Sequence, residues 1–112
     1  MKMIEAIIRP EKVEPVKAAL AEMGILGMTV TEVIGRGRQG GISLQWRVGE
    51  YKVEFLPKAK IEVVVLDEYL GKALNAIIRT ARTGKRGDGK IFVLPVDNVI
   101  RISNGDEGEN AI

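Results

Sequence analysis

The stretch KIEVVVLDEYLGKALNAIIRTARTGKRGDGKIFVL, residues 60–94, carries in succession the patterns of a strand, a helix, a glycine-rich loop and another strand. Residues 60–66 alternate, with Ile61, Val63 and Val65 on one face, which predicts a strand. Asp67 can then cap a helix whose apolar residues recur at helical spacing: Leu70, Ala73, Leu74, Ile77, Ile78 and Ala81. Residues 91–94 are apolar and predict the closing strand. The stretch therefore forms one β-α-β unit.

The first third of the chain repeats this order. Residues 3–9 are short, apolar-rich and closed by Pro10, which predicts a buried strand. A helix is predicted over residues 11–23, where apolar side chains share one face, and Gly24 ends it. Residues 28–34 are rich in β-branched side chains and predict another strand. Two such units define an α+β fold of the ferredoxin-like βαββαβ (split βαβ) type, with two helices on one face of a four-stranded sheet.

The other face of that sheet has no helix to cover it. Apolar residues such as Ile7, Val64 and Val93 fall on both sides of their strands, so we expect self-association. Residues 99–102 predict a short fifth strand. The polar tail, residues 103–112, is predicted to be flexible.

A long segment separates the two units. Residues 37–57 exceed the usual length of a loop inside a compact domain, and such loops are usually functional. Residues 43–47 and 51–55 could pair as a hairpin. Trp46 and Arg47 near its tip are candidates for docking a partner.

Two glycine-rich basic segments occur in the chain. They are residues 35–41, GRGRQGG, at the start of the long segment, and residues 83–90, TGKRGDGK, before the closing strand. Glycine lets backbone N–H groups approach an anion, and the neighbouring Arg and Lys side chains suit phosphate oxygens. Each loop alone could be an ordinary turn. Together they predict a site for a polyphosphate ligand.

Composition limits the number of domains and the classes of function that this chain can have. The 112 residues make one domain, residues 1–112, and a net charge of +2 does not indicate a duplex-binding surface. The chain has no Cys and no His, which excludes thiolate metal sites and removes the commonest general base. No apolar run approaches the roughly 20 residues of a membrane span, and the start does not resemble a signal peptide. We expect a cytoplasmic binding protein, not an enzyme.

The chain resembles the PII nitrogen-regulatory signal-transduction proteins along essentially its whole length. The segment Thr83–Val93 matches the family's C-terminal signature, and further motifs match in register: residues 28–33, Gly35, residues 37–39, residues 50–51 and residues 55–58. The resemblance implies a homotrimer whose intersubunit clefts bind ATP or ADP competitively. The residues it assigns to the nucleotide are Met28, Thr29, Gly35, Gly37, Arg38, Gln39, Glu62, Val64, Gly87, Asp88, Gly89, Lys90 and Arg101.

The same resemblance implies an effector and a switch. 2-Oxoglutarate would bind with Mg²⁺ and ATP, with Gln39 reaching the metal; its assigned residues are Gln39, Gly40, Gly41, Lys58 and Gly87. Residues 37–55 would be the family's T-loop and residues 82–90 its nucleotide loop. The implied partners are an ammonium channel, which Arg47 would enter, and nitrogen-assimilation enzymes or their regulators. Association with a membrane would be only through that channel, and Tyr51 stands where some branches are uridylylated or adenylylated.

Some positions depart from the family pattern. Trp46 replaces a usual Tyr, and Gly49 replaces the serine that the cyanobacterial branch phosphorylates. Gly40 replaces a common Lys, and Ser103 replaces an Arg that usually helps to hold phosphates. The last change predicts weaker nucleotide binding or weaker discrimination between ATP and ADP.

A different class of function fits the same fold. RNA-binding modules with this strand order stack bases on aromatic side chains of the sheet. Aromatics are 4% of this chain, and Phe92 is the only one in a firmly predicted strand, so we favour the signalling reading, with no nucleic-acid partner. A phosphoryl-transfer enzyme would need a nucleophile or a base, for which His is not present.

Overall fold

The computed structural model describes residues 1–37, 42–46, 49–53 and 55–112, and for 42–46 and 49–53 it describes the backbone. The strands are β1 (Lys2–Ile8), β2 (Thr29–Gly35), β3 (Ile42–Trp46), β4 (Gly49–Val53), β5 (Leu56–Val65) and β6 (Lys90–Pro95). The helices are α1 (Val13–Glu22) and α2 (Leu70–Ala81), with short 3₁₀ turns at Pro10–Lys12, Asp67–Tyr69 and Gly108–Ala111. The predicted α+β, ferredoxin-like order is confirmed.

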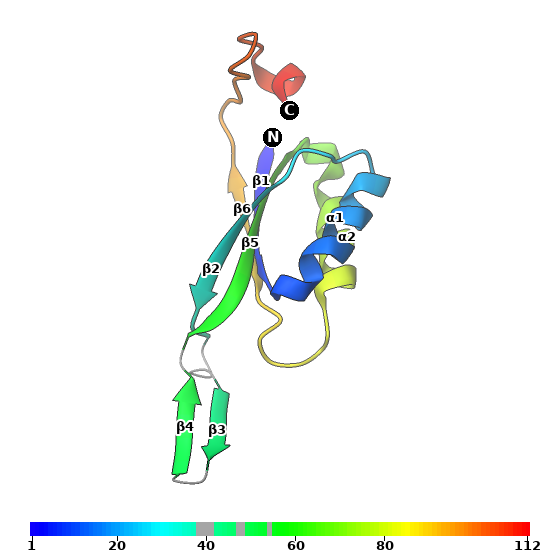
Figure 1. Ribbon diagram of the computed structural model, residues 1–112. Helices are drawn as coiled ribbons and strands as arrows, with labels where there is room; N and C mark the ends of the chain where they lie inside the picture. Colours follow the sequence, from blue (N-terminus) through cyan, green and yellow to red (C-terminus); the bar gives the residue numbers. More distant parts are fainter. Residues whose placement is uncertain (38–41, 47–48, 54) are drawn as a thin grey trace.

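Four strands form one antiparallel sheet in the order β2-β5-β1-β6, and both helices lie on the same face of it (Figure 1). Alternate residues of β1 and β5 point toward the helices and are buried, as period-two patterning requires. The core consists of Ile4, Ala6, Ile8, Val16, Ala19, Leu20, Ala59, Ile61, Val63, Val65, Ala73, Ala76, Ile77 and Ala81. Burial of these aliphatic side chains is the main force that holds helices to sheet.

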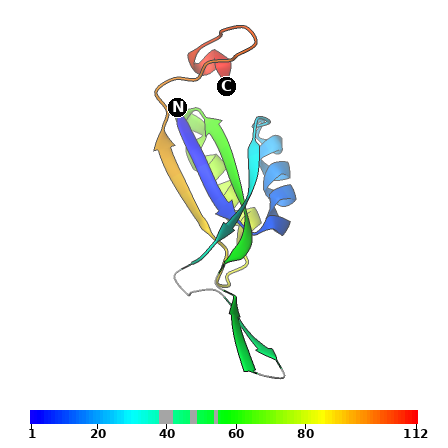
Figure 2. The same cartoon turned by 60° about the vertical axis from the view of Figure 1, so that its left-hand side comes forward.

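The opposite face of the sheet has no covering element among the described residues (Figure 2). Register places Met3, Glu5 and Ile7 there, beside Val64 of β5 and Phe92 of β6. Phe92 is 48% exposed, so this face is open in the single chain and presents apolar side chains beside charged ones such as Glu5. Val93 stands opposite the buried Ile4, which puts it on the helix side of the edge strand.

The long segment forms a hairpin that projects beyond the ends of β2 and β5 (Figure 1). β3 pairs with β4 in antiparallel register, from Ile42 opposite Val53 to Trp46 opposite Gly49. The predicted hairpin is therefore present, but its strands lie at 42–46 and 49–53, not at 43–47 and 51–55. β5 begins at Leu56, earlier than the predicted start at residue 60, because the β2 ladder continues to the Gly35–Leu56 pair.

Two sequence predictions were wrong in detail. Residues 99–102 do not form a strand; only Ile100 makes an isolated bridge, to Glu107, because the backbone there closes on itself instead of meeting the sheet. Asp67 does not cap a helix through its side chain. Its carboxylate lies 3.0 Å from the terminal ammonium of Met1 and 3.6 Å from the ammonium of Lys2, and these partners lower its pKa.

Candidate functional site

The loop between α2 and β6 is built on glycines with positive φ. Gly84, Gly87 and Gly89 have φ of +84°, +93° and +100°, a region that side chains with a Cβ rarely adopt. At Gly89 an added Cβ would lie 1.7 Å from the carbonyl oxygen of Ile7. Only glycine therefore lets this loop pass directly against the end of β1.

Asp88 is the centre of the loop. Its Oδ2 accepts hydrogen bonds from the backbone N–H groups of Thr83 and Gly84, both at 2.9 Å. Its Oδ1 accepts from the hydroxyl of Thr83 and from Nε of Arg9, the latter at 3.2 Å. The carboxylate therefore ties the start of the loop to its end and to the end of β1.

These bonds also set the charge state of Asp88. The hydroxyl of Thr83 is the largest cause that holds the pKa of Asp88 well below its usual range, and the N–H groups and Arg9 add to it against partial desolvation. A carboxylate would otherwise repel an anionic ligand. Here its charge is balanced inside the loop by donors already in contact with it.

Two cations converge on Gly87. The ammonium of Lys58 donates to the Gly87 carbonyl, and Nη2 of Arg9 donates to the Arg86 carbonyl at 2.6 Å. A Cβ added at Gly87 would lie 3.3 Å from Arg9 Nη2 and 3.4 Å from Lys58 Nζ. Among the described residues, the N–H groups of Gly87 and Asp88 have no hydrogen-bond partner. Cations and N–H donors of this kind are what an anion requires.

Burial lowers the pKa of Lys58, and the nearby charge of Arg9 lowers it further, while Glu11 and Asp88 partly offset both effects. Like charges held together disfavour the charged form, so an anion that bound beside them would relieve that repulsion. The structure thus brings Lys58, Gly87, Asp88 and Gly89 together, as predicted. Gly35 joins them at the end of β2, with Lys58 Cγ 3.5 Å from a Cβ placed there.

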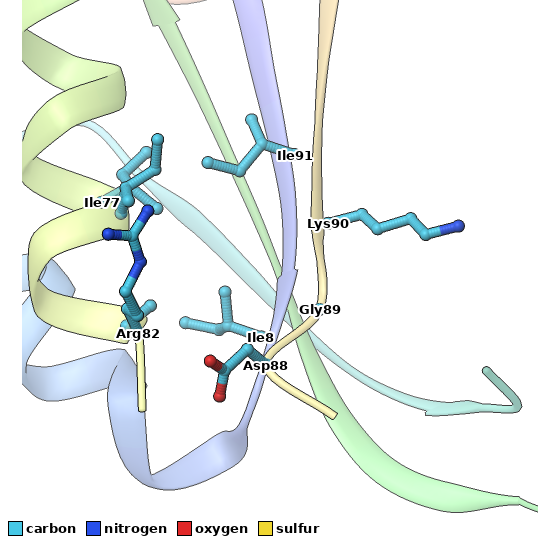
Figure 3. A pocket seen from close by; sticks show the side chains of 9 residues that line it. Ile8, Ile77, Arg82, Asp88, Gly89, Lys90 and Ile91 are labelled. Atoms are coloured by element: carbon cyan, nitrogen blue, oxygen red, sulfur yellow. The ribbon is translucent and has the colours of Figure 1, made fainter. Parts of the chain in front are cut away.

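Lys90 begins β6 on the other side of this loop. Figure 3 shows a pocket of about 310 Å³ between α2 and β6, into which Ile8, Ile77 and Ile91 point. The Lys90 side chain points away from that pocket, which fits its register opposite Ile7 on the open face of the sheet. Its ammonium is therefore available to a ligand on the open face, not to one in the pocket.

The remaining predicted residues lie toward the other end of the sheet. Thr29, at the start of β2, stands opposite Glu62, and Val64 stands opposite Met3. Met28 immediately precedes β2 and packs partly against the core. β6 runs the length of the sheet between Lys90 and the segment that carries Arg101 (Figure 1). One chain therefore does not bring Arg101 to the Gly87–Lys90 loop.

Arg101 is engaged by the C-terminal tail. Its Nη2 donates to the Asn110 carbonyl at 3.3 Å, and its Nη1 lies 3.9 Å from Oδ2 of Asp106. The Arg101 backbone N–H donates to the Asp106 carbonyl at 2.8 Å. The tail that was predicted to be flexible has a defined fold here, and its flexibility stays a prediction.

Several predicted residues lie outside the described part of the chain. Arg38, Gln39, Gly40, Gly41 and Arg47 belong to this group. Gly37 is described as an exposed residue that follows β2. Trp46 ends β3, and Tyr51 in β4 pairs with Leu44. The assignments of these residues to metal, effector or partner remain predictions.

One contributor was missed. Arg9 contacts Asp88 and the Arg86 carbonyl, although no sequence motif indicated it. The available signal was its place between a buried strand and Pro10, at the edge of the sheet.

The fold and the braced glycine loop define a class of small α+β proteins that carry a glycine-rich loop, contacted by Arg9 and Lys58, at one end of a ferredoxin-like sheet. The family model described as nitrogen regulatory protein P-II matches residues 1–106. Two nitrogen regulatory P-II proteins, from Klebsiella oxytoca and Pasteurella multocida (strain Pm70), are 58% and 56% identical over the full length of both chains. Nitrogen regulatory protein P-II 1 of Escherichia coli (strain K12) is 58% identical, again over both full lengths. The chain belongs to the P-II nitrogen regulatory family.

Two properties of the described residues bear on the expected membrane and metal partners. None of the helices there is long and apolar enough to cross a membrane. Within the same residues, acidic side chains do not gather in a group that could hold a metal ion by themselves.

Proposed function

We propose that this protein reports nitrogen and energy status by binding ATP or ADP in clefts between the subunits of a homotrimer. The observation that carries the proposal is the loop at residues 83–90, which is closed around Asp88 and lies against Arg9 and Lys58. Gly87 has no side chain beside these cations, and a Cβ there would lie 3.3 Å from Arg9 Nη2 and 3.4 Å from Lys58 Nζ. The uncovered face of the sheet, with exposed apolar side chains such as Phe92, and the distance of Arg101 from this loop support a site shared between subunits.

The proposal extends to the effector. 2-Oxoglutarate would bind only with Mg²⁺ and ATP, with one carboxylate beside Lys58 and with Gln39 at the metal. An anion next to Lys58 would offset the repulsion from Arg9 that lowers the Lys58 pKa. If Gln39 turned inward to the metal, residues 37–55 would change direction, and Arg47 would leave the pose in which it could enter an ammonium channel. Linkage then requires that 2-oxoglutarate and the channel weaken each other's binding.

Calorimetry tests the binding step. ATP and ADP should displace each other, and 2-oxoglutarate should give heat only in the presence of Mg²⁺ and ATP. A thermal-shift series with single-stranded RNA as a further arm separates this function from a nucleic-acid module on the same fold. Stabilisation by RNA alone, with no response to nucleotides, would contradict the proposal.

Retention on ammonium-channel membranes tests the switch. We expect retention with ADP, and release with Mg²⁺, ATP and 2-oxoglutarate together. Arg47→Ala should lose retention under ADP, while Lys17→Ala, on the exposed face of α1, should not. Equal retention in every ligand state would show that the segment does not switch.

A further inference from the structure

We propose that Arg9 is a positioning residue of the ligand site: it acts through Asp88 and the Arg86 carbonyl to hold the loop in the conformation that binds phosphate. This proposal rests on the proposed nucleotide function. It concerns a residue that would not touch the nucleotide but would decide whether Gly87 and its neighbours present their N–H groups correctly.

The backbone gives Arg9 a fixed place. Pro10 disfavours helical geometry in the residue before it, and Arg9 is extended, with φ −64° and ψ 140°. The ladder between β1 and β5 ends at the pair Ile8–Ala59. The same register carried one step further sets Arg9 beside Lys58, so both cations emerge at the end of the sheet that faces the loop.

The side chain makes contacts that only a fork of donors can make together. Nε bonds to the carboxylate of Asp88 at 3.2 Å, and Nη2 bonds to the Arg86 carbonyl at 2.6 Å. The side chains of Arg9 and Asp88 are each 25% exposed, so solvent competes little with this bond. A guanidinium holds several acceptors in fixed directions, whereas an ammonium is a point charge.

Arg9 also balances the negative charge of the Asp88 carboxylate at the site. It neutralises Asp88, which lies beside the predicted phosphate position, and it faces Lys58, whose ammonium holds the Gly87 carbonyl. Arg82 lines the pocket on the far side of Asp88. With the carbonyls of residues 86 and 87 both taken by cations, the loop keeps these acceptors away from an incoming phosphate.

The loop is separable from the core. Residues 82–88 are exposed or half-buried, and the buried cluster ends at Ala81 on one side, whereas Gly89 packs directly against β1. Loosening the loop should therefore change ligand binding with little change in global stability. That separation makes a positioning role distinguishable from a purely structural one.

The decisive experiment compares Arg9→Met, Arg9→Lys and the control Arg79→Met in the full-length protein. The control removes an equal positive charge from an exposed position on α2. We expect Arg9→Met to weaken both ATP and ADP by roughly tenfold, the usual scale for a charge-assisted hydrogen bond. Arg9→Lys should recover part of this loss, because it can still pair with Asp88. Arg79→Met should bind as the wild type, and thermal unfolding midpoints should stay close together.

Hydrogen exchange and pH provide readouts that do not depend on affinity alone. The N–H groups of Thr83 and Gly84 should exchange faster in Arg9→Met. Without Arg9 the pKa of Asp88 rises, although the hydroxyl of Thr83 and the N–H groups of Thr83 and Gly84 still lower it, so the loop should loosen at a slightly higher pH on acidification than in the wild type. Arg9→Lys should lie between the two.

The outcomes separate the two proposals. A wild-type protein that binds no nucleotide would overturn the proposed function. A wild type that binds, together with Arg9→Met that binds equally well and keeps slow exchange at Thr83, would overturn the positioning role. Equal loss in Arg9→Met and Arg9→Lys, in step with a fall in the unfolding midpoint, would also overturn it, because that pattern marks a structural role only.

Discussion

The loop at residues 83–90 and the tail at residues 98–111 stand at opposite ends of the sheet and are closed in similar ways. In the loop, Asp88 accepts N–H groups of its own turn and pairs with Arg9, a residue with no predicted ligand role. In the tail, Asp106 lies near Arg101, which is itself a predicted phosphate ligand. Under the proposed function, the loop would already be arranged to bind, whereas the tail would have to give up a contact before Arg101 could reach a nucleotide.

The largest expected difference between the two ends is in steric tolerance. Gly89→Ala should cost several kcal/mol, because positive φ and a 1.7 Å approach to the Ile7 carbonyl act together. Gly105→Ala, at φ +74° with nothing within 4 Å, should cost only about 1–2 kcal/mol. Urea midpoints measure both changes, and equal costs would show that the loop end is no more tightly built than the tail.

The second test asks whether the two ends meet across a subunit boundary. Lys90→Ala and Arg101→Ala should each weaken nucleotide binding by roughly ten- to a hundredfold, the cost of one charge-assisted contact. In trimers reassembled from both variants, about a quarter of the clefts should regain full affinity, because random assortment joins an intact Lys90 to an intact Arg101 of a neighbour. No recovery would place both residues in a site within one chain.

A smaller effect is expected from the tail alone. Asp106→Asn should tighten ATP about two- to threefold, since removing an exposed ion pair changes the free energy by only some tenths of a kcal/mol. Glu68→Gln, an exposed acid on the helix side of the fold, is the control. Unchanged ATP affinity in Asp106→Asn would mean that the Arg101 side chain is held in the tail by the Asn110 carbonyl and not by the Asp106 carboxylate.

The smallest effect is expected when the pH is lowered and the hydrogen-exchange protection of Thr83 is followed. The pKa of Asp88 is well below its usual range, so its contribution to stability is present above the ordinary carboxyl pKa and is lost only as pH falls through the lower, folded value. Hydrogen exchange at Thr83, corrected for intrinsic rates, should therefore keep the same protection from about pH 7 to about pH 4.5. Loss of protection near pH 5 would show that the donors around Asp88 are weaker than their geometry implies.

Much of the fold was predictable because local patterns and burial agree. The alternation in residues 60–66 and the helical spacing in residues 70–81 correspond directly to the buried faces of β5 and α2. Residues 99–102 show where local pattern fails. β-branched residues form a strand only where a neighbouring edge can pair with them, and here the chain turns back on itself instead.

The site was predictable in part for a related reason. Gly87, Asp88 and Gly89 lie in one continuous motif, so a single stretch of sequence reveals them. Arg9 acts from a strand at the other end of the chain and belongs to no motif. Its role depends on strand register and on the direction that Pro10 imposes, which only the assembled sheet reveals.

The contact between Arg9 and Asp88 also has a consequence for how the protein folds. It joins residues separated by 79 positions, and it requires β1 to have paired with both β5 and β6. Contacts of such high sequence separation form late, because the entropy cost of closing a long loop must be met before the contact can stabilise the chain. A ribosome-bound chain therefore cannot assemble this loop until β6 has emerged, and in refolding experiments nucleotide binding should appear with the slowest phase.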